Sequence, residues 1–179
     1  ISVSTDCVFS GRKGNYSESD EPDARDLYGL SKLLGEVKAG NCLTLRTSMI
    51  GRELNSQNSL VEWFLSNRGG RVDGWTKAIY SGFPTLELAK IIGDIIEFSP
   101  DLRGMYHVSS DPVSKFDLLQ LLDDAYGARV EITPSEKVVI DRSLDSTVFR
   151  EITGYAPPTW AEMVAAMAAD PTPYDEFDT

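Results

Sequence analysis

The sequence predicts an α/β fold built around a parallel sheet. Short β-rich runs alternate along the 179 residues with segments whose apolar residues recur at helical spacing, and this order is typical of strand–helix–strand units. Hydrophobic residues make up 41% of the chain, which is enough for a buried core, and no internal repeat is visible. The length fits one domain or one and a half.

The first part of the chain begins with a strand and a helix. Glycine, asparagine, serine and proline mark the loop between them, and Gly40 with Asn41 ends the helix, whose leucines recur at helical spacing. The elements predicted here are a strand over 1–9, a loop over 10–26, a helix over 28–38, a short buried strand over 42–46 and a helix over 59–65.

The second part alternates in the same way. Thr85 and Ser114 each precede an apolar-periodic segment, as N-cap residues do. Two prolines and four acids predict a loose tail over 170–179. The predicted elements are a loop over 74–84 with a short strand at 78–80, a helix from Thr85, a strand over 104–108, a helix over 115–126, a strand over 130–133, and helices over 145–153 and 159–169.

Charge and composition exclude several classes of partner. The formal net charge is −11 and the pI is near 4.5, so the chain repels phosphate backbones and nucleic acid is not an expected partner. A nucleotide ligand would need local cations for the same reason. No apolar run approaches the ~20 residues of a membrane span, and no signal peptide is visible. Cys7 and Cys42 show no metal-ligand spacing; we expect no metal site and a reducing cytoplasm.

The candidate chemistry lies in Tyr28 and Lys32, which follow the first strand. Residues four apart share one face of a helix, and an ammonium beside a phenol favours its phenolate form. Thr5 supplies a hydroxyl at the end of the strand. Together these residues supply a proton donor, a cation that lowers the pKa of that donor, and a hydrogen bond to a carbonyl. The spacing alone is a weak signal, because a surface helix with a solvated lysine gives the same pattern.

With its context the pattern resembles a known family. Ser-Thr-Asp-Cys-Val-Phe-Ser-Gly at 4–11, followed by Tyr-Gly-Leu-Ser-Lys at 28–32, resembles the extended short-chain dehydrogenase/reductases, above all the dTDP-4-dehydrorhamnose reductase branch. The resemblance covers essentially the whole chain. It implies the C-terminal part of a Rossmann-like parallel sheet plus a smaller α/β substrate-binding lobe.

The resemblance also implies a division of the chain. Residues 1–56 would be the C-terminal part of the dinucleotide-binding domain, 57–170 mainly the substrate-binding lobe, with elements that can interleave with the sheet, and 171–179 a loose tail. The glycine-rich turn of a dinucleotide-binding fold is absent, and the first residue is Ile1. We therefore expect a piece of a longer protein, and an isolated chain that is inactive.

The implied reaction is the reduction of a 4-keto sugar carried on a nucleotide diphosphate, with hydride from NADPH or NADH, in deoxysugar or polysaccharide biosynthesis. By resemblance, Tyr28 is the general acid, Lys32 also holds the nicotinamide ribose, and Thr5 bonds to the reacting oxygen. Thr47 and Ser48 are candidates to line the nicotinamide pocket, although a polar cluster at a strand end gives the same residues.

On the substrate side the resemblance points to Thr5, Asp6, Met49 and Arg142. If the strand continues past Thr5, Asp6 lies on its opposite face. Met49 stands where the family has a tryptophan that touches the sugar, and Met packs without stacking as a flat ring, so the sugar is left open. His107, the single histidine, is expected to pack structurally.

Two other functions stay open. A sugar-nucleotide epimerase or dehydratase uses the same tyrosine and lysine with a tightly held NAD. A non-enzymatic regulatory subunit, such as the β subunit of methionine adenosyltransferase, also resembles these reductases and serves as a partner protein. Self-association into a homo-oligomer is left open as well.

Overall fold

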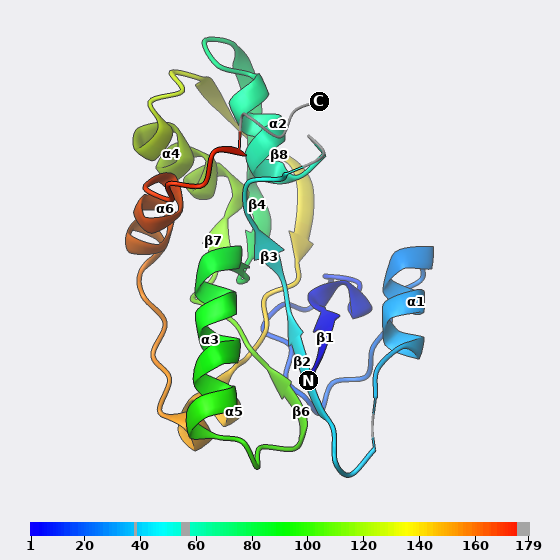
Figure 1. Cartoon of the computed structure of the whole chain (residues 1–179). Coiled ribbons are helices and arrows are strands. Elements are labelled where there is room, and N and C mark those ends of the chain that lie inside the picture. Colours follow the sequence, from blue (N-terminus) through cyan, green and yellow to red (C-terminus); the bar gives the residue numbers. More distant parts are fainter. Residues whose placement is uncertain (38, 55–57, 175–179) are drawn as a thin grey trace.

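The computed structural model of the chain describes residues 1–37, 39–54 and 58–174. A three-stranded parallel sheet forms the lower half of the molecule (Figure 1). Its order is β1 (Ser2–Thr5), β2 (Leu43–Thr47), β6 (Gly104–His107). Helix α1 (Leu27–Leu34) lies on one side of this sheet, and α3 (Thr85–Phe98) with α5 (Thr147–Thr153) lies on the other. The predicted α/β class and parallel sheet are confirmed.

A second sheet forms the upper half, in the order β7 (Val113–Ser114), β4 (Arg71–Tyr80), β8 (Glu131–Asp141). Strand β4 runs parallel to β8 and antiparallel to β7. Helices α2 (Leu60–Ser66), α4 (Lys115–Tyr126) and α6 (Trp160–Ala168) belong to this half. The short pair β3 (Met49–Ile50) and β5 (Phe83–Pro84) connects the chain between the two sheets. The single turn η1 (Asp6–Val8) follows β1.

The two long strands of the upper sheet correct the sequence-based prediction. The predicted loop over 74–84 is mostly β4, and the strand predicted over 130–133 extends to Asp141 as β8. Gly74 and the polar residues of β4 conceal its alternation, since its buried face includes Val72, Gly74, Ala78 and Tyr80. Pro134 lies within β8, which pairs only with β4 among the described strands, so its missing N–H is tolerated at an edge.

The helix boundaries also differ in places. Helix α1 ends at Leu34, although a helix to residue 38 is predicted; Lys38 lies outside the described residues. The N-cap of α3 is Pro84 instead of Thr85. Pro84 is held in the extended backbone of β5, and its φ of −59° already suits the start of a helix. Ser114 does cap α4, accepting a hydrogen bond from Asp117 N.

One continuous apolar core spans both halves, with members from β2, α2, β4, α3, α4, α5 and α6. A smaller cluster of Val8, Phe9, Tyr16 and Leu144 lies under the loop that follows η1. In the tail, Tyr174 donates to Asp170 at 2.6 Å, and the rest of the predicted loose segment, 175–179, lies outside the described residues. None of the helices that the structure describes has the length and apolar character to cross a membrane.

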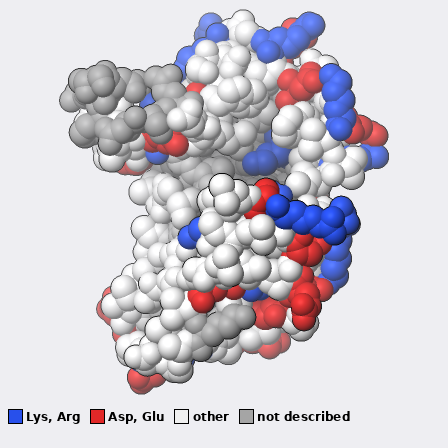
Figure 2. Space-filling model, turned by 90° about the vertical axis from the view of Figure 1, so that its right-hand side faces the viewer, with Lys and Arg blue, Asp and Glu red and all other residues white. Residues whose placement is uncertain are grey.

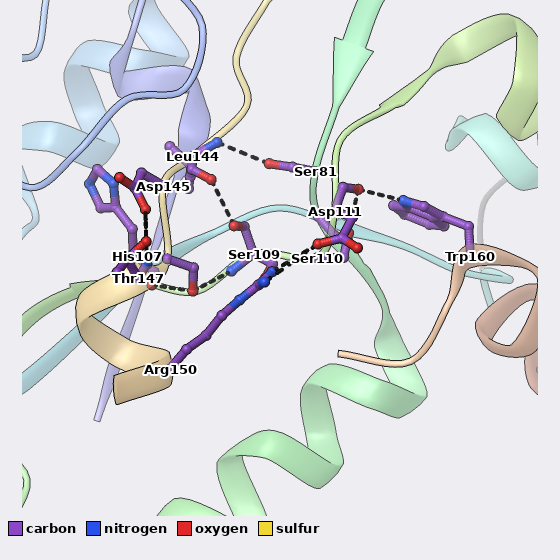
Figure 3. Close-up of polar contacts among 12 residues, drawn as sticks. Ser81, His107, Ser109, Ser110, Asp111, Leu144, Asp145, Thr147, Arg150 and Trp160 are labelled. Carbon is purple, nitrogen blue, oxygen red and sulfur yellow. Dashed lines mark hydrogen bonds and ion pairs between the residues drawn. The ribbon is translucent and has the colours of Figure 1, made fainter. Parts of the chain in front are cut away.

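Buried serines join the two halves where three strands end (Figure 3). Ser109 follows β6 and donates to Leu144 O at 2.8 Å, while Leu144 N donates to Ser81 Oγ at 3.0 Å. Ser110 N donates to Ser81 O at 2.8 Å. Arg150 of α5 donates to Ser109 O at 3.0 Å. These bonds fix the segments after β4, β6 and β8 to one another, so the two sheets share a defined geometry.

A buried ion pair holds the lower sheet to the segment after α1. Arg46 of β2 binds Glu36 with two hydrogen bonds of 2.7 and 2.8 Å, and both side chains are almost fully buried. Ser4 of β1 donates to the same carboxylate at 2.8 Å. The Arg46 guanidinium also lies over the Phe9 ring, 5.3 Å from its centroid. The pair therefore connects two strands and the segments that follow β1 and α1.

His107 completes this arrangement and is structural, as predicted. Arg46 Nη1 lies 3.3 Å from His107 Nε2, and His107 Nδ1 lies 2.8 Å from Tyr16 O. Because a guanidinium only donates, Nε2 accepts and Nδ1–H donates to the carbonyl, which defines the neutral tautomer. Burial lowers the pKa of His107, Arg46 lowers it further, and Glu18 and Glu36 oppose the shift.

This burial of His107 predicts a pH dependence of stability. Because the folded-state pKa lies below the unfolded value of 6.5, the unfolded chain binds more protons between the two values. The free energy of unfolding is therefore retained above pH 6.5 and declines as the pH falls below it. Urea unfolding across this range measures the decline, which should be smaller in His107→Gln because that side chain does not titrate. Equal slopes for the two proteins would contradict the prediction.

Candidate active site

The candidate site begins where β1 ends. The strand predicted over 1–9 stops at Thr5, and η1 takes over. Thr5 Oγ1 accepts from Cys7 N at 3.2 Å and donates to Asp6 Oδ1 at 3.1 Å. Asp6 therefore lies beside Thr5 and does not occupy the opposite face of a continuing strand. A hydroxyl carries one proton, so Thr5 donates either to Asp6 or to a ligand.

Asp6 is a buried carboxyl in an unfavourable environment. Burial raises its pKa, and hydrogen bonds from Cys7 and Thr5 and the nearby charges of Arg142 and Lys115 counter the shift without cancelling it. Arg142 comes from the end of β8 and donates to Phe9 O at 2.9 Å and to Cys7 Sγ at 3.5 Å. In the sequence, only the family resemblance assigns Asp6 and Arg142 to one site. The structure brings both residues to the end of β1.

Helix α1 carries Tyr28 and Lys32 alongside that end. Asp26 caps the helix by accepting from Gly29 N at 2.8 Å, which lowers the pKa of Asp26. Lys32 Nζ donates to Val3 O at 2.9 Å, so the lysine ties the helix to β1. Tyr28 is 56% exposed. The phenol thus stands open to solvent near the strand end that carries Thr5.

Gly29 allows this close contact between helix and strand. A Cβ at position 29 would lie 2.3 Å from the backbone oxygen of Cys7 and 2.6 Å from Cβ of Ala24. Both neighbours are short and the first is backbone, so neither yields by rotation. The glycine between Tyr28 and Lys32 therefore sets the distance from α1 to η1.

The predicted cofactor residues lie at the neighbouring strand end. Thr47 is the parallel neighbour of Thr5 in the sheet and is buried. Ser48 is half-buried, and its carbonyl accepts from Phe83 N at 2.9 Å. Met49, in β3, is 50% exposed. The carboxyl ends of parallel strands are the usual ligand-binding edge of such sheets, and Thr5, Thr47 and Ser48 all lie there.

Two further residues near the end of β1 were not predicted as site residues. Tyr80, at the end of β4, has a buried hydroxyl with no hydrogen-bond partner in the part of the chain that the structure describes, and burial raises its pKa well above 10.0. Lys115 Nζ lies 4.4 Å from the centroid of the Tyr80 ring. Burial lowers the pKa of Lys115, and Asp6 and Cys7 oppose that shift. No motif marks either residue, and only the last three residues of β4, 78–80, were predicted as a strand.

Other basic residues near the predicted lobe are engaged elsewhere. Arg52 pairs with Glu62, and Arg71 and Lys77 form exposed ion pairs with Glu131 and Glu136. On the face that carries α1, a recess separates the two halves, and Lys or Arg side chains lie in and beside it (Figure 2). Among the described residues, no group of three His, Cys, Asp or Glu side chains forms a metal site.

The parallel sheet with helices on both sides, together with the second α/β half, defines a class of fold, that of the extended short-chain dehydrogenase/reductases. The sequence model of the RmlD substrate binding domain family matches residues 1–172. The chain belongs to this family.

Solved structures agree with this assignment. A hypothetical dTDP-4-dehydrorhamnose reductase from Sulfolobus tokodaii is 30% identical, with a TM-score of 0.73, over 88% of this chain and 60% of that chain. A dTDP-4-dehydrorhamnose reductase from Bacillus anthracis, solved in complex with NADP, is 24% identical with a TM-score of 0.76, over 93% of this chain and 63% of that one. At that identity the second likeness concerns the fold alone.

Curated relatives include methionine adenosyltransferase 2 subunit beta from Danio rerio, 28% identical over 138 residues, which is 70% of this chain and 43% of that protein. The same subunit from Rattus norvegicus is 28% identical over 142 residues, 70% of this chain and 41% of that protein. The chain thus spans less than half the length of these curated relatives.

Gly29 gives a direct test of the site geometry. We expect Gly29→Ala to lower the free energy of unfolding by about 1–3 kcal/mol, the usual cost of overpacking, because the new methyl meets backbone. Gly93→Ala in α3 is the matched control, since nothing lies within 4 Å of its added Cβ; it should stabilise by about 0.5–1 kcal/mol through helix propensity. Denaturant unfolding measures both, and a neutral Gly29→Ala would show that α1 is free to move away from η1.

Proposed function

We propose that the whole protein reduces a nucleotide-linked 4-keto sugar with a hydride from NADPH or NADH. The observation that carries the proposal is that α1, which bears Tyr28 and Lys32, lies against β1 and η1, with Lys32 donating to Val3 O and Gly29 next to the Cys7 carbonyl. Membership of the RmlD substrate binding domain family supports it, and so does the reductase named for the 30% identical structure.

In this reaction the sugar carbonyl oxygen gains negative charge and must be protonated. Tyr28 is the proton donor, because its phenol is exposed and lies on the helix next to the strand end. Thr5 donates a hydrogen bond to the same oxygen once it releases Asp6, and a donor aimed at developing charge is an effective aid to catalysis. Lys32 retains two N–H donors beyond the one given to Val3 O. In this proposal they orient the ligand.

The donors at this edge fit a dinucleotide's ribose and nicotinamide amide. Hydroxyls of Tyr28 and Ser48 and the ammonium of Lys32 are polar groups at the carboxyl end of the sheet, while Thr47 is buried behind them. When bound, the cofactor supplies the hydride. The protein's share is to hold the sugar carbonyl and supply the proton. Met49 and Arg142 face the sugar side in this proposal, and Arg142 is positioned by Phe9 O.

Tyr28→Phe tests the proton donor. In the full-length protein we expect turnover with a 4-keto sugar nucleotide to fall by about 10²–10⁴-fold, as for loss of a general acid, with substrate affinity nearly unchanged. Tyr106→Phe is the matched control, because no hydrogen bond to the Tyr106 hydroxyl exists among the described residues and the ring packs near Phe149. NADPH oxidation measures turnover.

The outcomes separate the rival reactions. Wild-type turnover in Tyr28→Phe would refute the acid assignment. Conversion of a nucleotide sugar to its epimer without net NADPH oxidation would replace the reductase by an epimerase.

A second candidate is a partner subunit without catalysis of its own. The observation in its favour is the 28% identity to methionine adenosyltransferase 2 subunit beta. If the protein acts this way, the full-length chain should co-elute with a methionine adenosyltransferase catalytic subunit from the same organism and alter its kinetics. We expect no such complex. A stable complex, found together with no turnover of any 4-keto sugar nucleotide, would favour the subunit role.

A further inference from the structure

A cavity of about 520 Å³ opens between α2, β4 and α4, beside the candidate site. Trp63 and Trp75 line it, and each is 41% exposed. Indole rings left half-open in one cavity offer flat apolar surface of the kind on which nucleobases stack. The remaining lining residues are Asn58, Ser59, Leu60, Asp73, Lys115 and Leu119.

Lys115 stands in this cavity as a cation without an anionic partner. Its Nζ forms no ion pair or hydrogen bond with any residue that the structure describes, and its recorded contact is the Tyr80 ring at 4.4 Å. It is also the first residue of α4, where the helix dipole disfavours positive charge. A half-buried ammonium without an ion pair at the positive end of a helix is unfavourable, so this charge does not stabilise the unliganded protein.

The carboxylates nearest to Lys115 are bonded to other residues or form no ion pair with it. Asp73, which also lines the cavity, is paired with Lys137 at 3.0 Å. Asp117 in the first turn of α4 is engaged with Ser114. Asp6 acts on Lys115 electrostatically without forming an ion pair with it. Lys115 therefore links the cavity to the Thr5 end of β1, and among the described residues that line the cavity it is the cation that forms no ion pair.

We propose that Lys115 binds the diphosphate of the substrate and that Trp63 and Trp75 hold its nucleobase, so that the sugar extends past Tyr80 to Thr5 and Tyr28. This inference rests on the proposed function and adds to it the residues that recognise the nucleotide. The chain's net charge of −11 repels such a ligand, and Lys115 supplies the local positive charge that binding requires.

The test uses calorimetric titration of the full-length protein with dTDP and with UDP. Lys115→Met should weaken binding of the nucleotide that the wild type prefers by about 10- to 100-fold, the usual effect of losing a charged hydrogen bond. It should also flatten the dependence of affinity on salt, because one ionic contact is lost. Lys115→Arg should retain most of the affinity, and Trp75→Ala should lose roughly 10-fold or more through lost stacking.

Stability provides the second readout. Because Lys115 is half-buried and forms no ion pair or hydrogen bond among the described residues, Lys115→Met should raise the melting temperature of the unliganded protein while it lowers nucleotide affinity. Lys90→Met on the exposed face of α3 is the matched control and should change neither. A structural lysine would lose stability and affinity together, and that result overturns the inference.

The remaining outcomes are equally decisive. Nucleotide affinity within twofold of the wild type in Lys115→Met, with turnover of a 4-keto sugar nucleotide intact, overturns the role of Lys115 alone. If the wild type binds neither nucleotide and oxidises no NADPH with any such substrate, the proposed function fails and the inference fails with it.

Discussion

The buried ion pair between Glu36 and Arg46 is the interaction on which the lower half of the molecule depends. It gathers Ser4 from β1, the guanidinium from β2 and His107 from β6 around one carboxylate and one arginine. Removing one partner of such a pair leaves an uncompensated buried charge, which typically costs ~3–5 kcal/mol. The pair is satisfied only when all three strands and the segment after α1 are in register. It therefore specifies the arrangement of the sheet more than it adds to stability.

That arrangement determines the candidate site. Glu36 follows α1 directly, so the ion pair fixes one end of the segment that carries Tyr28 and Lys32. Lys32 then reaches Val3 O, and Gly29 permits contact with η1. At the other side, His107 holds Tyr16 O and with it the loop that leads from η1 to α1. Buried polar contacts thus hold helix α1 and the loop before it against the end of β1 that carries Thr5.

Local patterns in the sequence predict much of this. The α/β class, the parallel sheet and most helices follow from periodicity, and the Thr5, Tyr28 and Lys32 set follows from spacing and resemblance. Only short parts of β4 and β8, residues 78–80 and 130–133, were predicted as strands. The full strands are stabilised by pairing with each other across some 60 residues, and Gly74 and Pro134 weaken their local signal. Tyr80 and Lys115 were missed for a related reason. Each is an ordinary residue in its own segment, and only the tertiary fold places the ammonium over the ring and near Asp6.

Several groups in unfavourable environments lie where we propose that the ligand binds. Burial raises the pKa of Asp6 and lowers that of Lys115, and the Tyr80 hydroxyl has no partner among the described residues. Two other buried polar atoms, the Tyr126 hydroxyl and Arg150 Nε, also lack a partner among the described residues, whereas the serines that join the two halves are paired. Unpaired polar groups oppose folding, so the Lys115 ammonium and the Tyr80 hydroxyl suit a surface whose partners arrive with the substrate. A nucleotide sugar supplies complementary groups, an anion for the ammonium and hydroxyls for the carboxyl and the phenol. Binding would then relieve desolvation that folding alone leaves uncompensated.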